Sequence, residues 1–341
     1  MPSELISPAL GQVAWRAYTE APLAPGQVRL KALLGAEKHG TAAAMLKGHA
    51  NLRGAWDETF QVFRPGSNWA DYPLILGNQV VAEVVELGAG VSKRRISDRV
   101  LGFAGFRPTL TVAEDWGWVL EPTILAEDAL CLDPALFALG AIRDGHVRLG
   151  DVVAVTGLGA IGLVAVALLR HAGITRIIVS DPVAKRMELA RQIGASDSIP
   201  VGGDTGLRLK ELTAGRGPDV ILDFSGSLPA MQAALRGIAF GGTIVMAAFP
   251  APWPAGIDFG GEFHMNRPRL MSSRACSDPN PDHPRWDFAR LHSSVFDLIR
   301  AGAIPGKLLI DPIIPLAGLA EVYSPIVLDP VGGIKLGVRY A

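Results

Sequence analysis

The 341-residue chain has few of the features that mark secreted or membrane proteins. It contains only two cysteines, Cys131 and Cys276, which lie far apart and outside any paired motif. Two cysteines can build neither a disulfide framework nor a thiolate zinc cluster, so we expect each to be a small buried apolar side chain. No stretch is long and apolar enough to span a bilayer, and residues 1–5 lack the charged start of a signal peptide.

The chain also has no large excess of charge of either sign. It contains 32 basic and 33 acidic side chains, which give a formal net charge of −1 at pH 7. No basic run stands out, which argues against nucleic acid and anionic membranes as partners. Hydrophobic residues make up 49% of the chain, enough to bury the cores of two domains. We therefore expect a two-domain cytoplasmic protein.

The stretch 152–169 is an apolar run broken by a glycine-rich turn. This order predicts a buried strand, a tight turn and a helix, with a diphosphate bound where the helix exposes its first N–H groups. Gly157 permits the turn, Gly159 lets the diphosphate approach the backbone, and Gly162 lets the helix pack closely on the strand. The candidate cofactor-binding residues of the turn are Gly157, Gly159, Ala160, Ile161 and Gly162.

A second predicted strand, 176–180, ends at Asp181, close to the ~20 residues beyond the glycines at which a dinucleotide motif places an acid. An acid there accepts both hydroxyls of the adenosine ribose and repels a 2′-phosphate, so the sequence predicts NAD(H) over NADP(H). The alternative is a surface aspartate in an unrelated α/β fold. Arg186 lies nearby, and a basic residue at this place could tolerate the phosphate.

The pattern of predicted elements changes along the chain. Up to residue 133, many short strands punctuated by glycine and proline predict an antiparallel, barrel-like domain. Strands then alternate with helices, which predicts a doubly wound parallel sheet of an α/β fold. The tail differs again, with a helix near 286–300 and a final strand at 333–339. We expect a catalytic domain formed by 1–133 and 276–341 around a dinucleotide-binding domain, 134–275.

Five motifs occur in an order typical of one superfamily, and they lie at 25–28, 74–77, 84–91, 98–100 and 157–162. The chain resembles the medium-chain dehydrogenase/reductase superfamily over nearly its whole length, the zinc alcohol and polyol dehydrogenases in particular. The resemblance implies a GroES-like β-barrel-type catalytic domain, a Rossmann domain, hydride transfer at a nicotinamide, and homodimers or homotetramers. It also implies cofactor contacts from Ser225, Gly226, Ala248, Phe249 and Lys335. For Lys335 the alternative is a surface lysine on a strand.

The zinc-ligand positions of the superfamily hold other residues in this chain. A cysteine ligand falls at Glu37, and a Gly-His-Glu motif falls at 77–79, where Asn78 replaces the histidine. A third ligand would fall next to Asp133, and the cysteine-rich lobe that holds a structural zinc is missing. Glu37, His39 and Asp133 could formally supply three ligands, but Asn78 is a poor one, so the sequence predicts no metal.

Without a metal, oxidation of an alcohol requires a general base. His39 is the candidate, because its unperturbed pKa of about 6.5 suits reversible proton transfer. Glu37 could raise that pKa or hold the tautomer, and Lys38 could contact the diphosphate or stabilise an alkoxide. Asn78 and Gln79 could bind a hydroxyl-rich substrate or cap a strand. The alternative for residues 37–39 is a solvated loop.

Two further polar residues have open interpretations. Asp133 could bind substrate or cap the helix that starts at Pro134. His264 lies in the polar segment 262–267, which could be a substrate loop, a subunit-interface loop or an ordinary surface excursion.

These observations together predict a zinc-independent, NAD-linked oxidoreductase that interconverts a polar secondary alcohol, of sugar, polyol or cyclitol type, and its ketone. One alternative is a zinc-free reductase of activated C=C bonds, of the quinone or enoyl type, against which Asp181 argues. The other is a non-catalytic NAD-binding protein.

Overall fold

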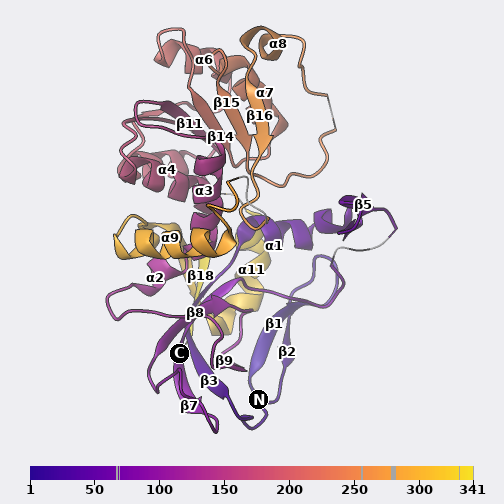
Figure 1. The fold of residues 1–341 in the computed structure, drawn as a ribbon. Coiled ribbons are helices and arrows are strands. Elements are labelled where there is room, and N and C mark those ends of the chain that lie inside the picture. Colours follow the sequence, from indigo (N-terminus) through magenta and orange to yellow (C-terminus); the bar gives the residue numbers. More distant parts are fainter. Residues whose placement is uncertain (67, 69, 255, 278–281, 330, 341) are drawn as a thin grey trace. The chain divides into compact units, whose positions relative to one another are not determined.

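The computed structural model describes residues 1–341 except 67, 69, 255, 278–281, 330 and 341 (Figure 1). The chain divides into two units. The first combines Met1–Leu130 with Ile310–Ala341, and the second is Cys131–Leu309. The two ends of the chain thus form one unit and the middle forms the other.

The second boundary lies later than the sequence pattern suggested, at 309/310 instead of 275/276. The reason is helix α9 (Phe288–Arg300), which packs on α3 (Leu132–Asp144) of the second unit. One face of α9 is buried, and it consists of Leu291, Val295, Phe296 and Ile299. The helix begins where the Asp287 carboxylate accepts a hydrogen bond from Arg290 N at 2.7 Å, an N-cap that satisfies one of the unpaired first-turn donors.

The second unit is built on a six-stranded parallel sheet with the strand order β13-β12-β11-β14-β15-β16 (Figure 1). Its strands are β11 (Val152–Thr156), β12 (Arg176–Ser180), β13 (Asp197–Ser198), β14 (Val220–Asp223), β15 (Thr243–Met246) and β16 (Arg269–Ser272). Its remaining helices are α4 (Ala160–His171), α5 (Ala184–Ile193), α6 (Thr205–Leu212), α7 (Leu228–Gly237), α8 (Glu262–Asn266) and α10 (Gly306–Leu309). Every residue of β11 is buried, as in a parallel sheet covered on both faces. The predicted doubly wound Rossmann sheet is therefore confirmed.

The strand order reverses between β11 and β14, because the strands that follow β11 are first added on one side of it and then on the other. Open α/β sheets bind their ligands outside the carboxyl ends of the strands at such a switch point. The glycine-rich turn leaves β11 at this place, so the topology and the motif indicate the same site.

The first unit is largely antiparallel. Its main sheet has the order β10-β8-β7-β3-β18-β17 with β9 beside β3, and smaller sheets have the order β2-β1-β6 and β4-β5. The strands are β1 (Ser3–Ser7), β2 (Ala14–Ala17), β3 (Gln27–Ala36), β4 (Ala55–Asp57), β5 (Val62–Arg64), β6 (Leu74–Ile75), β7 (Gln79–Leu87), β8 (Arg99–Phe103), β9 (Thr109–Ala113), β10 (Trp118–Val119), β17 (Ile310–Pro315) and β18 (Lys335–Arg339). The expected antiparallel domain is confirmed, with β17 and β18 as a parallel pair inside it.

Strand β3 brings the two ends of the chain together. One edge of β3 pairs with β7, and the other pairs first with β9 over 27–31 and then with β18 over 34–36. One face of β3 is buried, and it consists of Val28, Leu30, Ala32 and Leu34. As a result, the loop that follows β3 begins directly beside β18.

The helices of the first unit are short. They are α1 (His39–Leu46), η1 (His49–Asn51), α2 (Ala126–Ala129), η2 (Leu316–Gly318) and α11 (Leu319–Leu328). Helix α11 packs on α1 and β18 and contributes Tyr323 to the core of this unit. Across the described ranges of the chain, no helix is long and apolar enough to cross a membrane. The cysteine expectation is correct for Cys131, which is buried, and wrong for Cys276, which follows β16 and is exposed.

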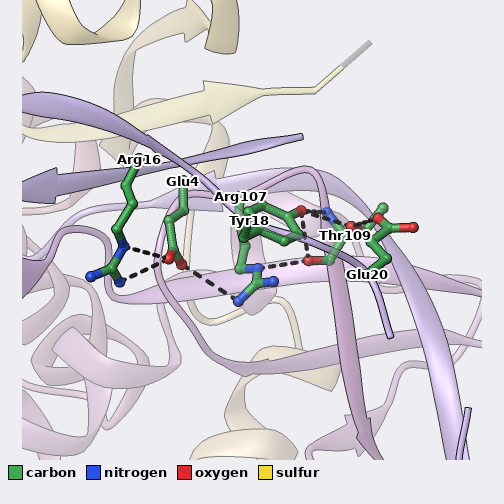
Figure 2. A network of polar contacts seen from close by, with 6 residues as sticks. All are labelled: Glu4, Arg16, Tyr18, Glu20, Arg107 and Thr109. Carbon is green, nitrogen blue, oxygen red and sulfur yellow. Dashed lines mark hydrogen bonds and ion pairs between the residues drawn. The ribbon is translucent and has the colours of Figure 1, made fainter. Parts of the chain in front are cut away.

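A polar network holds β1 and β2 to the segment before β9, as Figure 2 shows. Glu4 is only 5% exposed, and its Oε1 accepts hydrogen bonds from Arg16 Nε at 3.0 Å and Nη2 at 2.8 Å. Its Oε2 lies 3.5 Å from Nη1 of Arg107, whose guanidinium lies 3.8 Å from the ring centre of Tyr18. The Tyr18 hydroxyl lies 2.7 Å from Thr109 Oγ1. The buried charge of Glu4 is therefore matched by two arginines, as a buried carboxylate requires.

Candidate active site

The turn between β11 and α4 packs tightly against its neighbours. Gly157 N donates to Ser180 O at 3.0 Å, and the φ angle of Gly157 is +82°, in the left-handed region that favours glycine. A Cβ atom on Gly157 would lie 2.5 Å from Ser225 N, and one on Gly162 would lie 2.0 Å from Gly157 O. The fold of the second unit itself therefore requires both glycines.

Gly159 is different, because nothing in the second unit requires a glycine there. It is the N-cap of α4 with φ −68° and ψ −172°, a backbone that any residue adopts. A Cβ atom on Gly159 would meet no described atom within 4 Å. The space lies at a helix amino terminus, where N–H groups have no partner within the helix. Open space beside unpaired donors fits a diphosphate, and Ala160 and Ile161 follow in the first turn of the helix.

Asp181 follows β12 and is 3% exposed. Its Oδ2 accepts a hydrogen bond from Leu158 N at 2.7 Å, and its Oδ1 accepts one from Val183 N at 2.8 Å. The carboxylate thus holds the glycine-rich turn from the β12 side. A carboxylate has about four lone-pair sites, so each oxygen keeps one that these two backbone N–H groups do not use. Arg186 lies close, with Nη1 at 4.0 Å from Oδ2.

The turn after β14 lies on the other side of the glycine-rich turn. Ser225 is exposed, and Gly226 has φ +62°. A Cβ atom on Gly226 would lie 3.1 Å from Ala248 Cβ, so the segments after β14 and β15 pack together. Phe249, next along the chain, is 57% exposed. The predicted cofactor residues of the second unit therefore gather at the carboxyl ends of its central strands.

The sequence analysis missed Asp223, the last residue of β14, which is 0% exposed. Its Oδ1 accepts hydrogen bonds from Thr156 Oγ1 at 2.8 Å, Ser225 N at 3.0 Å and Ser225 Oγ at 2.6 Å. Burial raises the pKa of the Asp223 carboxyl, and the hydrogen bonds from Ser225 and Thr156 lower it. The one signal in the sequence was an acid that closes a fully apolar strand just before Ser225-Gly226.

In the first unit, Glu37 follows β3 and is 3% exposed. Its Oε2 accepts a hydrogen bond from Tyr323 Oη at 2.6 Å, and its Oε1 accepts one from Lys38 N at 2.7 Å. Burial raises the pKa of the Glu37 carboxyl, while the Tyr323 hydroxyl, the Lys38 N–H group and the Lys335 ammonium lower it. A solvated loop is thus excluded for Glu37, and Lys38 and His39 are half-buried.

Strand β18 holds the loop that contains Glu37. Leu336 N donates to His39 Nε2 at 2.8 Å, and Leu336 O accepts a hydrogen bond from Glu37 N at 2.9 Å. Lys335 Nζ donates to Glu37 O at 2.7 Å, and Lys335 is 2% exposed, so the interpretation as a surface lysine is wrong. Because Nε2 accepts a hydrogen bond, the neutral His39 ring carries its proton on Nδ1. This histidine is also the first residue of α1.

Asn78 and Gln79 lie beside the same loop at the start of β7. Asn78 N donates to Ala36 O at 3.1 Å, and Ala104 N donates to Asn78 O at 3.1 Å. Asn78 Nδ2 is buried and has no hydrogen-bond partner among the residues that the structure describes. Such a donor needs an acceptor beyond the described residues, such as water or a ligand, to be satisfied. Gln79 is 0% exposed and Asn78 is half-buried, so the Gln79 amide is enclosed in the first unit.

Asp133 and His264 lie in the second unit. Asp133 is not a helix cap, because α3 begins at Leu132 with Cys131 as its N-cap, and Asp133 is a buried residue of the first turn. His264 is exposed on the short helix α8. The structure therefore brings together Glu37, Lys38, His39, Asn78 and Gln79 in one unit, and the cofactor candidates other than Lys335 in the other.

The fold and these residues define a two-domain dehydrogenase with a Rossmann sheet, and the chain belongs to the medium-chain dehydrogenase/reductase superfamily. It is an alcohol dehydrogenase of the medium-chain type. The zinc-binding dehydrogenase family matches residues 160–286. The chain is 36% identical over 354 aligned residues to D-guloside 3-dehydrogenase of Escherichia coli K12, an alignment that covers 99% of both chains.

Two solved structures share the fold. The chain is similar to 2R,3R-butanediol dehydrogenase from Bacillus subtilis with a TM-score of 0.79 and 20% identity, over 99% of both chains. It is similar to an alcohol dehydrogenase from E. coli CFT073 in complex with NADH with a TM-score of 0.75 and 19% identity, again over 99% of both chains. These two likenesses show the fold, and the family predicted from the sequence is confirmed by the relative that matches along the whole chain.

Proposed function

We propose that this enzyme uses NAD(H) to interconvert a polar secondary alcohol, of sugar, polyol or cyclitol type, and its ketone. The observation that carries the proposal is the open space at Gly159, which lies at the amino terminus of α4 beside the carboxylate of Asp181. A bound nicotinamide would supply the hydride acceptor or donor. The chain would hold the diphosphate at the glycine-rich turn and the adenosine ribose at Asp181.

The cofactor preference depends on Asp181. A negative charge that is already fixed by Leu158 N and Val183 N sits where the ribose hydroxyls would bind, and it disfavours a 2′-phosphate. Arg186 lies against the same carboxylate and could otherwise pair with a phosphate. The ion pair with Asp181 supports NAD(H) as the better cofactor.

The substrate class follows from the polar groups of the first unit. Asn78 Nδ2 is a buried donor whose hydrogen bonds the described residues leave unmade, and a substrate hydroxyl can accept them. Gln79 adds an enclosed amide. A relative that is similar along the whole chain is a dehydrogenase of the 3-position of a guloside, which supports a hydroxyl-rich substrate.

We infer that the reaction proceeds without zinc, because the donor set does not fit the ion. Among the described residues, no group of three or more histidine, cysteine, aspartate or glutamate side chains is arranged to hold a metal. The two carboxylate oxygens of Glu37 accept hydrogen bonds from Tyr323 Oη and Lys38 N. Nε2 of His39 accepts one from Leu336 N. Hydrogen-bond donors thus use lone pairs that a metal would need.

The alcohol proton must then pass to a side chain. His39 is the first candidate for the general base, but its Nε2 already accepts a hydrogen bond from Leu336 N. The nitrogen without a proton is Nε2, so the ring must release Leu336 N before Nε2 can take a proton, while Nδ1–H can donate to a substrate oxygen. Glu37 is the second candidate, since burial raises the pKa of its carboxyl toward the working range of a general base.

The test is an assay of NAD⁺ reduction with a panel of glycosides, polyols and cyclitols, with metal analysis of the same preparation. We expect turnover with a polar secondary alcohol, no loss of kcat on treatment with a chelator, and kcat in His39→Ala reduced by about 10²-fold or more. His49→Ala is the matched control, because His49 is an exposed histidine of the same unit. Stoichiometric zinc whose removal abolishes turnover would contradict the zinc-free reaction, and full activity of His39→Ala would remove that residue from the proton transfer.

A further inference from the structure

Strand β14 ends in a carboxylate for which the proposed reaction has no role. Asp223 is 0% exposed, and three hydrogen bonds from Thr156 and Ser225 all reach its Oδ1. Its Oδ2 is also buried and has no partner at normal hydrogen-bond geometry within the described part of the chain, although the Gly226 N–H group lowers the pKa of the carboxyl. Oδ1 is therefore held firmly, and Oδ2 is left without a hydrogen bond of normal geometry.

An unsatisfied buried carboxylate oxygen costs folding free energy. The rest of β14, Val220 to Leu222, is apolar. A smaller or apolar residue at position 223 would therefore cost less folding free energy than this carboxyl group. A buried polar atom that is left unpaired needs an explanation other than stability. The position of Asp223 in the sheet supplies one.

Asp223 lies at the switch point of the sheet, opposite Thr156 in the β11–β14 pair. Its Oδ1 joins the last residue of β11 to the turn that follows β14, since it binds Thr156 Oγ1 as well as Ser225 N and Oγ. The backbone of Ser225 in turn packs against Gly157, where a Cβ atom would lie 2.5 Å from Ser225 N and 2.7 Å from Ser225 Cα. The place of Ser225 thus sets one wall of the glycine-rich turn, and Asp181 holds the opposite wall through Leu158 N.

We propose that Asp223 is a positioning residue of the dinucleotide site. Its Oδ1 holds the Ser225–Gly226 turn against Gly157, so that the glycine-rich turn has its binding geometry before the diphosphate arrives. Preorganisation of this kind lowers the cost of ordering the site on binding and so tightens it. The inference depends on the proposed use of NAD(H), and it concerns cofactor affinity, not the hydride transfer itself.

The same strand offers a matched control at its other end. Asp219 Oδ2 accepts a hydrogen bond from Val152 N at 2.8 Å, so it also joins β14 to β11, but at the amino ends of the strands. The Asp219 side chain is 29% exposed and pairs with Arg216 at 3.1 Å. Loss of Asp219 removes a comparable link between the two strands at the edge of the sheet away from the glycine-rich turn.

The experiment measures the Kd for NADH by fluorescence titration, together with kcat and the KM for NAD⁺. For Asp223→Ala we expect the Kd to rise by about tenfold to a hundredfold, the equivalent of one or two lost hydrogen bonds, with kcat at saturating NAD⁺ within about twofold of the parent. Asp223→Asn keeps an acceptor at Oδ1 and should stay within about threefold of the parent Kd. Asp219→Ala should bind NADH as the parent does.

Several results would overturn the proposal. One is a folded Asp223→Ala protein whose Kd for NADH equals that of the parent. Another is a Kd that rises as much in Asp219→Ala as in Asp223→Ala. The third is a Kd that rises as much in Asp223→Asn as in Asp223→Ala. If Asp223→Ala does not fold, Asp223→Val, an apolar residue that suits the end of this strand, takes its place, and an unchanged Kd there has the same meaning. A parent protein that binds no NADH contradicts the proposed function, whereas a parent that binds and an Asp223→Ala protein that binds equally well contradict only this inference.

Discussion

Removal of the Tyr323 hydroxyl tests the buried contact at Glu37. Tyr323 is 0% exposed, and its Oη donates to Glu37 Oε2 at 2.6 Å. Phenylalanine keeps the ring and its edge contact with Phe106, whose centre lies 6.4 Å away, so Tyr323→Phe removes the hydroxyl alone. A hydrogen bond to a charged group contributes about 1.5–3 kcal/mol and one between neutral groups about 1 kcal/mol. In Tyr323→Phe the free energy of unfolding should therefore fall by about 1.5–3 kcal/mol at pH values where Glu37 is ionised, and by about 1 kcal/mol where Glu37 is protonated.

The pH dependence has a definite sign. Burial raises the pKa of Glu37 in the folded protein, so the folded state keeps a proton that the unfolded chain releases. The contribution of Glu37 protonation to the free energy of unfolding is fully present below the pKa that Glu37 has in the unfolded chain. It is lost as the pH rises through the pKa that Glu37 has in the folded protein. The Tyr323 hydrogen bond lowers the folded pKa, so Tyr323→Phe raises it and extends the decline to higher pH. The difference in the free energy of unfolding between Tyr323→Phe and the parent should therefore increase as the pH rises and decrease as the pH falls.

Urea unfolding at a series of pH values measures this difference. Tyr340→Phe is the matched control, because Tyr340 is buried in the same unit and its Oη has no hydrogen-bond partner among the described residues. It should leave the free energy of unfolding unchanged or raise it. In a Glu37→Gln background the effect of Tyr323→Phe should shrink to about 1 kcal/mol and lose its pH dependence. A loss in Tyr323→Phe that is the same at every pH and in both backgrounds would refute the reasoning.

Four other substitutions have outcomes that follow from the geometry. Gly159→Ala should leave the free energy of unfolding unchanged or raise it by up to about 1 kcal/mol, yet weaken NADH binding in a fluorescence titration, because its Cβ fills open space in front of α4. Gly162→Ala should lower the free energy of unfolding in urea by about 2 kcal/mol or more, since its Cβ would lie 2.0 Å from Gly157 O. Asp181→Ser should lower kcat/KM for NAD⁺ relative to NADP⁺ by roughly tenfold in parallel assays, because the charge that repels a 2′-phosphate is gone. His39→Asn keeps an amide N–H near the place of Nδ1, so it should retain more kcat than His39→Ala, and equal losses would count against a donor at Nδ1.

The Rossmann unit could be predicted from the sequence because its signals are local. The apolar run of β11, the glycines after it and the acid after β12 lie within 30 residues, and each follows from the conformation of its own segment. Short-range chemistry therefore decides this part of the fold.

Elements that depend on tertiary packing were missed or misplaced. The short strands β4, β5 and β13 and the polar helix α6 have too few apolar residues to show a period. The boundary at 309/310 depends on the packing of α9 against α3, which no local pattern encodes.

The candidate site shows the same division. The position of Glu37 and His39 after β3 follows from the order of motifs, but their contacts come from residues nearly 300 positions away. Tyr323 is 286 positions from Glu37, and Leu336 is 297 positions from His39. The sequence placed Lys335 at the cofactor, and the structure shows its ammonium on the Glu37 carbonyl. Motif spacing predicted the loop and could not predict what holds it.

These distant contacts explain how the proposed zinc-free site would keep its geometry. In a zinc dehydrogenase the ion itself fixes the loop that carries its ligands. In this chain, β18 fixes the loop through Leu336, which binds His39 Nε2 and Glu37 N, and α11 fixes the carboxyl group through Tyr323. Hydrogen bonds from the last 20 residues of the chain thus do for Glu37 and His39 what coordination does for a ligand set, and the antiparallel pairing of β18 with β3 brings them there. A substitution in β18 or α11 should therefore alter the proton chemistry of the loop even where it touches no substrate atom.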